Sequence, residues 1–428
     1  STPPLHPPLS KGGRMGGVAF LWDESFLWGL MAYKALKAYG LPFDLIKAED
    51  IKAGALNGYK MLFVPGGWAS NKIKALGEEG AAAIRKFVSD GGSYLGFCGG
   101  AGLATAGKDG LGLVNIKRRP TKERVPSFSG RIELNINEHP IWKDIPPHPP
   151  LTKGGHRGGG NSHPVFHAWW PSQFIVEDDS IKILATYGDA LPDAFSSDIC
   201  VGDVDSSGRW EELEAVYKIN LNPARLRDEP AVIEGIYGKG KVVLSLVHFD
   251  TPEDVNGQRV LENLWEYFGC QNTELRIQNP DEIKSKGSPG SGLWTLCSEL
   301  ISLGERNFLW FWRNTMLLQW RRGVRGLEYN TLYIMIKEIV GRGVACNAPA
   351  IGRLQDSLVP FVDKAKKLLV LERHALQKGH ITYERCEDPD IQKLRGELFS
   401  ESKSHGGKFK ELVDEIDNIL FLHLTGQD

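Results

Sequence analysis

The stretch GGSYLGFCGGAGLA, residues 91–104, decides the fold of the first part of the chain. Its apolar run at 93–98 predicts a buried strand, and the glycines that follow predict a tight turn into a short helix. A Gly-x-nucleophile-x-Gly turn holds its central residue, here Cys98, on an elbow where larger flanking side chains would collide. The N-terminus of the next helix favours a thiolate over a thiol. The motif predicts a nucleophilic cysteine, and the alternative is a structural cysteine buried among packing glycines.

A second glycine pair ends the preceding predicted strand. Residues 61–67 read MLFVPGG, so this strand runs into Gly66 and Gly67. In α/β proteins the carboxyl ends of neighbouring parallel strands meet at one edge of the sheet, where binding sites form. The backbone N–H of Gly67 is therefore expected near that of Gly99, and two such donors form an oxyanion hole. An ordinary Gly-Gly turn is the alternative.

The candidate general base follows a later strand. The run KVVLSLVHF at 241–249 predicts a buried strand, and residues two apart on a strand lie on the same side of the sheet. His248 and Asp250 are then expected to act as a base and the acid that orients it, which is the arrangement a cysteine nucleophile requires. Glu253 is a rival for the role of the acid. The alternative is a buried histidine at a strand end without a chemical role.

Strand and helix signals alternate over residues 17–270. Apolar strands are predicted at 18–22, 43–48, 61–67, 93–98, 131–136, 181–187, 231–237 and 241–249, and helices at 27–39, 78–88 and 260–268. Repeated strand–helix–strand units predict an α/β domain with a mostly parallel sheet and helices on both faces.

The character of the sequence changes after residues 271–292, which are polar, end in Pro, Gly and Ser, and are expected to form a linker. Beyond this segment the apolar residues recur every three or four positions. The spacing predicts helices at 293–322, 327–340, 351–378, 388–404 and 408–424. An all-α helical bundle over 293–428 is the simplest packing of these helices.

A short repeat interrupts this scheme twice. Residues 7–17 read PPLSKGGRMGG and residues 149–159 read PPLTKGGHRGG. Pro-Pro and Gly-Gly pairs are incompatible with helices and inner strands, so both copies are expected in exposed loops. We interpret residues 1–16 as a repeat-derived disordered segment and residues 146–160 as a loop inserted in the α/β domain. A proline-rich ligand for a partner is the alternative.

Composition limits the classes of function. The 428 residues carry a formal net charge of −2, which does not favour nucleic-acid binding. Six cysteines without a CxxC pair indicate reduced thiols and a cytoplasmic location, and no apolar run is long enough to span a membrane. His163 and His167 are separated by Pro164, which disfavours a helical metal site. Neither a metal nor a cofactor is therefore expected.

The stretches VPGG (64–67), GGSYLGFCGGAGLA (91–104) and GKVVLSLVHFDTP (240–252) resemble the class I glutamine amidotransferase-like superfamily. Within it, the run AAIRKFVSDGGSYLGFCGGAG (82–102) is most similar to the domain at the N-terminus of eukaryotic-type biotin–protein ligases. The resemblance covers about residues 17–270 and does not extend to the helical region. It implies a flavodoxin-like three-layer sandwich with a Cys–His–acid triad.

Carried over to this sequence, the resemblance implies that Cys98 is the nucleophile, His248 the base and Asp250 the acid. It also implies that Gly67 and Gly99 contribute to the oxyanion hole. One departure is that glutamine amidotransferases typically have His-Pro-Glu where this chain has His-Phe-Asp. The acid is present with a shorter side chain, and glutamine is not secured as the substrate.

Together these observations predict a cysteine-dependent hydrolase or amidotransferase that acts on a small-molecule amide or related acyl group through a thioester. Residues after 270 lack the Gly/Arg-rich adenylate loop and the Lys-Trp-Pro-type motif of a ligase core, so biotin ligation by this chain is not expected. Glu24, Trp170 and Glu253 are the candidate pocket residues. The competing hypothesis is a non-catalytic ligand-sensing or scaffolding protein whose helical domain docks a protein partner.

Overall fold

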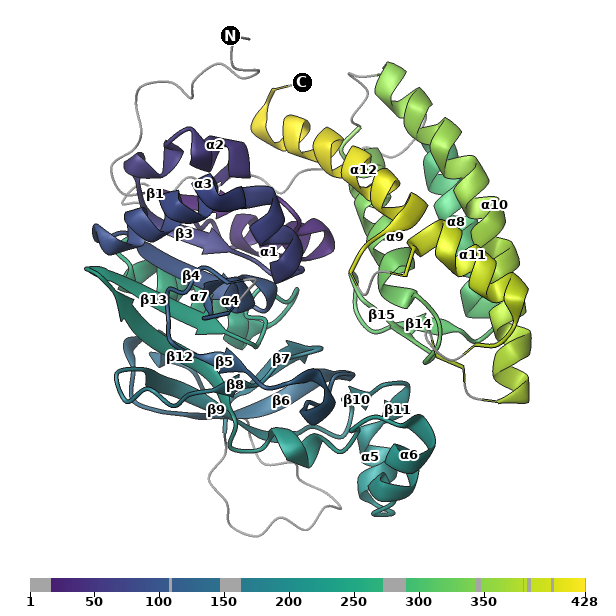
Figure 1. The fold of residues 1–428 in the computed structure, drawn as a ribbon, viewed down its shortest axis with the longest axis horizontal. Coiled ribbons are helices and arrows are strands. Elements are labelled where there is room, and N and C mark those ends of the chain that lie inside the picture. The colour runs from purple at the N-terminus through teal and green to yellow at the C-terminus, as the bar shows by residue number, and fades with distance from the viewer. Residues whose placement is uncertain are drawn as a thin grey trace.

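Two regions of the chain lie side by side in the computed structural model (Figure 1). The described residues are 17–107, 110–146, 163–271, 290–343, 348–379, 381–382, 386–401 and 404–427. The α/β region ends at residue 271 and the second region begins at residue 290. The predicted segment 1–16, the second repeat copy at 149–159 and residues 272–289 of the predicted linker lie outside the described residues.

Among the described residues, eleven strands form one sheet in the order β11-β10-β6-β9-β12-β13-β4-β3-β1-β2, with β7 paired to β6. The parallel half contains β1 (Gly17–Leu21), β2 (Asp44–Ile46), β3 (Tyr59–Val64), β4 (Ser93–Phe97) and β13 (Gly240–Ser245). The antiparallel half contains β6 (Phe128–Ile136), β7 (Val165–Trp169), β9 (Lys182–Ala190), β10 (Phe195–Ser196), β11 (Ile199–Cys200) and β12 (Pro230–Tyr237). The expectation of a mostly parallel sheet is correct for the first half and wrong for the second.

The change of strand direction begins at the connection between β12 and β13. Tyr237 pairs with Gly240, so Gly238 and Lys239 alone join the two strands. Gly238 has a φ of +59°, which suits a tight hairpin turn and which glycine adopts without steric cost. Parallel neighbours need a crossover of a dozen or more residues, so this short connection makes β12 antiparallel to β13.

A row of aromatic rings forms the core of the parallel half. Phe20 of β1, Phe63 of β3 and Phe97 of β4 meet edge to face, with ring centroids 5.1 Å apart in each pair. Phe249 continues the row at 5.6 Å from Phe97. These rings pack the neighbouring strands whose carboxyl ends carry the predicted site. The helices of this half are α1 (Phe26–Ala38), α2 (Ala48–Lys52), α3 (Ala69–Ser89), α4 (Gly99–Ala104) and α7 (Val255–Tyr267).

Shorter elements complete the α/β region. The strands β5 (Lys117–Arg118) and β8 (Phe174–Ile175) form a separate antiparallel pair. Two short helices, α5 (Val201–Asp205) and α6 (Trp210–Tyr217), lie between β11 and β12 in the chain. Turns of 3-10 helix occur at Ala55–Gly58, Thr121–Glu123, Pro140–Trp142 and Pro223–Leu226.

Where the structure describes the second region, it is helical except for one hairpin. Its helices are α8 (Ser291–Arg306), α9 (Gly326–Gly341), α10 (Ala348–Lys378), α11 (Pro389–Phe399) and α12 (Gly407–Thr425). The strands β14 (Trp310–Trp312) and β15 (Leu318–Trp320) pair antiparallel. The helix predicted at 293–322 therefore ends at Arg306, and the prediction of an all-α bundle is wrong at this hairpin.

Turn chemistry explains the hairpin. The side-chain oxygen of Asn314 accepts hydrogen bonds from the backbone N–H groups of Met316 and Leu317, each at 2.8 Å. Asparagine favours such turns because its side chain replaces a backbone acceptor. The Trp-Phe-Trp run at 310–312 adds aromatic residues that favour strands. Helical spacing of apolar residues alone did not distinguish this segment from a helix.

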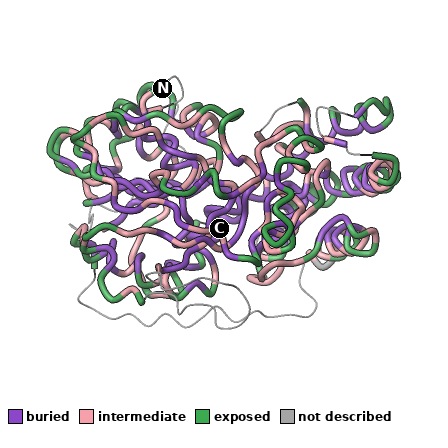
Figure 2. The backbone as a smooth tube through the Cα atoms, turned by 90° about the horizontal axis from the view of Figure 1, so that it is seen from below, coloured by how far each residue is buried: buried purple, intermediate pink, exposed green. Residues whose placement is uncertain are grey.

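The two regions are in direct contact. Lys34 of α1 forms an ion pair with Glu338 of α9 at 2.8 Å, and the rings of Trp22 and Phe421 lie 6.5 Å apart. Figure 2 shows that buried residues continue where the two regions meet. None of the described helices combines the length and the apolar character that a bilayer-crossing helix requires.

Candidate active site

Cys98 occupies a strained turn between β4 and α4. The strand ends at Phe97 and the helix begins at Gly99, so Cys98 is the single residue between them. Its φ of 49° and ψ of −104° are unusual for a residue with a side chain, and such strain is concentrated at functional sites. The backbone N–H of Cys98 donates to the carbonyl oxygen of Ser245 at 2.8 Å, which ties the elbow to the end of β13.

The glycines on either side of Cys98 permit close backbone packing. A Cβ on Gly99 would lie 1.8 Å from the carbonyl oxygen of Gly67, and one on Gly100 would lie 1.9 Å from that of Val64. A Cβ on Gly96 would lie 2.6 Å from the carbonyl oxygen of Gly100. No other residue fits these positions without backbone movement. The elbow and the end of the VPGG stretch are therefore in van der Waals contact, as the sequence predicts for strands ending at one edge.

His248 and Asp250 form a fully buried pair. The Nδ1 atom of His248 lies 3.0 Å from Oδ1 of Asp250, and neither side chain is exposed to solvent. The strand β13 ends at Ser245, so the pair lies in a turn and not on the extended segment that the sequence predicts. The backbone N–H and the hydroxyl of Thr251 both donate to the carbonyl oxygen of His248. This turn brings the two side chains together.

The electrostatics of the pair favour a protonated imidazole. Burial alone would lower the pKa of His248, but the charge of Asp250, the hydrogen bond to it and a smaller contribution from Cys98 raise this pKa to about 10. The Nε2 atom of His248 makes no standard hydrogen bond within the described residues. This nitrogen is therefore available to exchange a proton with Cys98, which itself contributes to the pKa of His248.

Gly67 and Gly99 lie against each other in the two loops beside Cys98. Gly99 is the first residue of α4, where a backbone N–H has no partner inside the helix. Gly67 has a φ of +117°, and a Cβ there would lie 2.3 Å from the carbonyl oxygen of Glu24. The turn after β1 therefore packs on the same loop and restrains it.

Trp170, one of the candidate pocket residues, belongs to an aromatic stack. Its ring stacks on Trp320 of β15 with centroids 4.9 Å apart, and it meets Trp28 of α1 at 6.0 Å. The ring of Trp28 in turn lies 4.9 Å from the imidazole of His248. Trp28 and Trp320 were not identified from the sequence, because nothing in their local patterns indicates a site. The second region thus reaches this stack through Trp320, while Trp28 is the ring beside His248.

Glu24 and Glu253 have different surroundings. The carboxylate of Glu24 accepts a hydrogen bond from Asn71 at 3.3 Å and forms an ion pair with Lys410 of α12 at 3.0 Å. Both of its oxygens are thus engaged, one of them by the second region. Glu253 is exposed and has a φ of 64°. The acid bonded to the Nδ1 atom of His248 is Asp250, so the rival assignment to Glu253 gains no support from the geometry.

Lys72 of α3 is a buried cation that sequence analysis missed. Its side chain is fully buried, and its pKa is lowered by burial to about 8 although Asp23, Glu24, Asp417 and Cys98 oppose the shift. A signal was present in the sequence, because Lys72 lies one turn before the buried Leu76, in the part of α3 that precedes the break at Gly77. A lysine on an apolar helical stripe is unusual.

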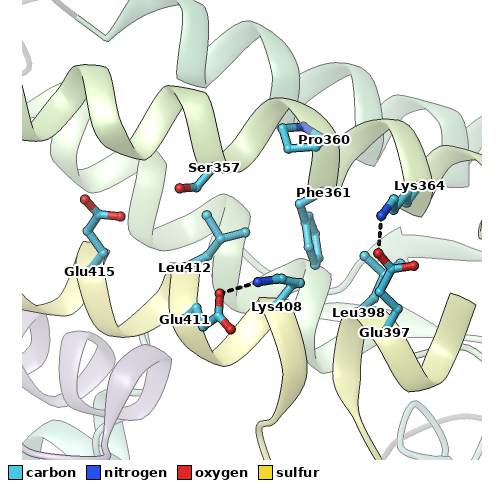
Figure 3. Close-up of a pocket in the computed structure, with 10 residues that line it drawn as sticks. All are labelled: Ser357, Pro360, Phe361, Lys364, Glu397, Leu398, Lys408, Glu411, Leu412 and Glu415. Carbon is cyan, nitrogen blue, oxygen red and sulfur yellow. Dashed lines mark hydrogen bonds and ion pairs between the residues drawn. The ribbon is translucent and has the colours of Figure 1, made fainter.

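Other candidate positions do not join this site. The Nδ1 atom of His167 lies 2.8 Å from Asp254, and His163 is not part of that pair. Within the described residues, no cluster of three or more His, Cys, Asp or Glu side chains could hold a metal ion. A groove of about 190 Å³ lies between α10, α11 and α12, and Phe361, Leu398 and Leu412 are among its lining residues (Figure 3). Neither Glu24 nor any residue of the proposed triad lines this groove.

Comparisons with known proteins support part of the resemblance. The family described as "Biotin-protein ligase, N terminal" matches residues 55–107, which contain β3, α3, β4 and the elbow. The prediction of a segment similar to this ligase domain is thereby confirmed. No curated protein matches the sequence.

The solved structures that match this chain include proteins described as a glutamine amidotransferase and a GMP synthase-type subunit. A glutamine amidotransferase has 19% identity, a TM-score of 0.35, and coverage of 59% of this chain and 100% of its own. A GMP synthase-type protein from Thermoplasma acidophilum has 12% identity, a TM-score of 0.36, and coverage of 59% and 94%. A β-galactosidase from Bacillus circulans has 15% identity, a TM-score of 0.34, and coverage of 60% and 31%.

Proposed function

We propose that this chain is a cysteine-dependent hydrolase or amidotransferase whose triad is Cys98, His248 and Asp250. The observation that carries the proposal is the fully buried His248–Asp250 pair beside the strained Cys98 elbow. A protonated imidazole next to a thiol stabilises the thiolate, which is the reactive form of cysteine. The proposed domain is a flavodoxin-like three-layer sandwich over residues 17–270, followed by a helical domain over 293–428.

The proposed reaction has two halves. The Cys98 thiolate attacks the carbonyl carbon of a small amide, and the N–H groups of Gly67 and Gly99 stabilise the resulting oxyanion. His248 donates its proton to the leaving amine, the C–N bond breaks, and a thioester remains on Cys98. The neutral His248 then takes a proton from water or an acceptor amine, which attacks the thioester. The acid or new amide leaves, and the thiolate and imidazolium are restored.

Asp250 has an orienting role in this scheme. Its hydrogen bond to Nδ1 keeps Nε2 as the nitrogen that faces the reacting groups. Its negative charge also stabilises the protonated imidazole. Aspartate performs this role with a shorter side chain than glutamate because the Thr251 turn brings the acid within 3.0 Å.

A covalent acyl-enzyme is the direct test of the proposal. Wild type and Cys98→Ala are incubated with a panel of small activated amides and esters, and intact-mass spectrometry records any adduct. We expect an acyl adduct on wild type that maps to the peptide containing Cys98, and none on Cys98→Ala. Turnover that persists in Cys98→Ala, or an adduct at another thiol, would reject Cys98 as the nucleophile.

A second candidate function is ligand sensing without turnover. The observation that favours it is the stack of Trp170 on Trp320, which is a contact between the α/β region and the second region. A bound ligand then changes the contact between the two regions, and a protein partner reads that change through the helices. A ligand from the amide panel that shifts the unfolding temperature of wild type and Cys98→Ala equally, with no acyl adduct, supports this function over catalysis.

A further inference from the structure

Lys72 is a buried cation without a carboxylate partner among the described residues. Its Nζ atom donates to the carbonyl oxygen of Asp23 at 2.9 Å and to the hydroxyl of Ser25 at 2.5 Å. Within the part of the chain that the structure describes, no carboxylate oxygen lies within ion-pair distance of this ammonium. The carboxylate of Asp23 instead accepts from the backbone N–H of Ala48 at 2.6 Å. A buried, unpaired ammonium costs free energy, so its presence calls for an explanation.

The lysine side chain lies directly behind the oxyanion loop. A Cβ on Gly67 would lie 3.3 Å from Cε of Lys72, which places the lysine stem against this glycine. The carbonyl oxygen of Gly67 in turn packs against Gly99. A continuous line of contacts therefore runs from the ammonium of Lys72 through Gly67 to the elbow that carries Cys98.

Several charged groups face this ammonium. Asp23 and Glu24 belong to the turn after β1, Asp417 belongs to α12, and Cys98 belongs to the elbow. Burial raises the pKa of Asp23, and burial raises the pKa of Asp417 well above its usual value. Cys98 is the member of this group that belongs to the elbow next to Gly67.

We propose that Lys72 is a positioning residue that stabilises the Cys98 thiolate through space and holds the oxyanion loop against the elbow. The two hydrogen bonds to Asp23 and Ser25 fix the turn whose backbone contacts Gly67. The charge of the ammonium adds to that of the protonated His248. This inference rests on the proposed function, since it concerns the same thiolate.

The test measures thiolate reactivity without a substrate. Wild type and variants are alkylated with iodoacetamide at pH 6.5, and peptide mass spectrometry follows Cys98 and Cys200. Cys200 is the internal reference because these two are the partly exposed cysteines among the described residues. We expect Lys72→Met to lower the Cys98-to-Cys200 rate ratio roughly tenfold, as expected when one nearby opposite charge is removed. The control Lys74→Met removes an exposed lysine from the same helix and is expected to leave the ratio unchanged.

A second variant separates charge from hydrogen bonding. Lys72→Gln retains a donor for the Asp23–Ser25 turn but has no charge, so it serves where the methionine variant does not fold. We expect Lys72→Gln also to lower the Cys98-to-Cys200 rate ratio roughly tenfold. A wild-type ratio in a folded Lys72→Gln protein would overturn the inference while leaving the triad intact. If Cys98 of wild type reacts no faster than Cys200, the proposed function itself fails, so the two failures are distinguishable.

Discussion

The imidazole of His248 and the carboxylate of Asp250 lie 3.0 Å apart in a turn where both side chains are completely buried. A buried pair of this kind is tolerated when each partner satisfies the other, and it is costly once one partner is removed. The pair lies beyond the end of β13, beside the backbone that anchors Cys98. Because folding changes the pKa of His248, the contribution of this pair to the free energy of unfolding depends on pH.

Removing the acid tests this pH dependence. The pKa of His248 rises from 6.5 to about 10 in the folded protein, so its stabilising contribution is complete below pH 6.5 and is lost as the pH rises towards 10. Asp250→Asn should lower the free energy of unfolding by about 3 to 5 kcal/mol at pH 6.5. Urea denaturation at several pH values should show the gap to wild type narrowing between pH 6.5 and 10. A difference in unfolding free energy between wild type and Asp250→Asn that stays constant over this pH range would contradict the charge coupling of His248 with Asp250.

The close packing of the elbow predicts a steric effect. Gly99→Ala places a Cβ 1.8 Å from the carbonyl oxygen of Gly67, and such overpacking should cost at least about 3 kcal/mol of unfolding free energy. Gly396→Ala is the matched control, because its added Cβ meets no described atom within 4 Å beyond its chain neighbours and its own helix backbone. That helical substitution should stabilise by about 0.5 to 1 kcal/mol. Equal stabilities of the two variants in urea titrations would show that the elbow is not packed in this way.

His405 predicts sensitivity to acid at the contact between the two regions. Its ring lies 4.9 Å from Phe409 and 5.5 Å from Phe26. Burial, with Lys410 and Arg325, lowers the pKa of His405 to about 3. Its neutral form therefore contributes stability that is complete above pH 6.5 and is lost as the pH falls towards 3.

Replacing this histidine should remove part of that acid sensitivity. Between pH 6.5 and 4, His405 contributes up to about 1.4 kcal/mol per pH unit to the fall in unfolding free energy. We expect His405→Phe to reduce the slope of that fall by this contribution. The exposed His374 provides the control, and His374→Phe should keep the wild-type slope. If the unfolding free energies of wild type and His405→Phe fall in parallel as the pH is lowered, this histidine is excluded as a source of acid sensitivity.

The ion pair between Glu24 and Lys410 predicts energetic coupling across the interface. Both side chains are largely buried, with 18% and 25% of their surfaces exposed. We expect Glu24→Gln and Lys410→Met each to lower the free energy of unfolding by about 1 kcal/mol, with a coupling of about 0.5 to 1 kcal/mol in the double variant. Strictly additive effects would mean that the contact contributes no net stability.

The sequence predicted the parts of the fold that depend on local pattern. The strand, elbow and helix around Cys98 follow from alternating apolar and glycine residues, and the match over residues 55–107 covers this segment. The hairpin at 310–320 was missed because Trp310, Leu317 and Leu318 also fit helical spacing, while the turn depends on one asparagine side chain. The antiparallel half was missed although the two-residue Gly238–Lys239 connection was visible.

The site was predicted less completely than the fold. Cys98 directly follows β4, and His248 and Asp250 lie in the turn after β13. Their residue types match a nucleophile, a base and an acid. Lys72 contacts Gly67 from a helix, and Trp320 contacts Trp170 from the second region. These are tertiary contacts that no local spacing rule predicts.

The pH dependence of Cys98 alkylation tests the triad most directly. Wild type and His248→Gln are treated with iodoacetamide from pH 5 to 9, and Cys200 is followed in the same digests as the reference thiol. We predict that at pH 6.5 Cys98 of wild type reacts at least about ten times faster than Cys200, and that His248→Gln removes this advantage. A Cys98 rate that matches Cys200 across the range, or one that His248→Gln leaves unchanged, would contradict the proposed triad.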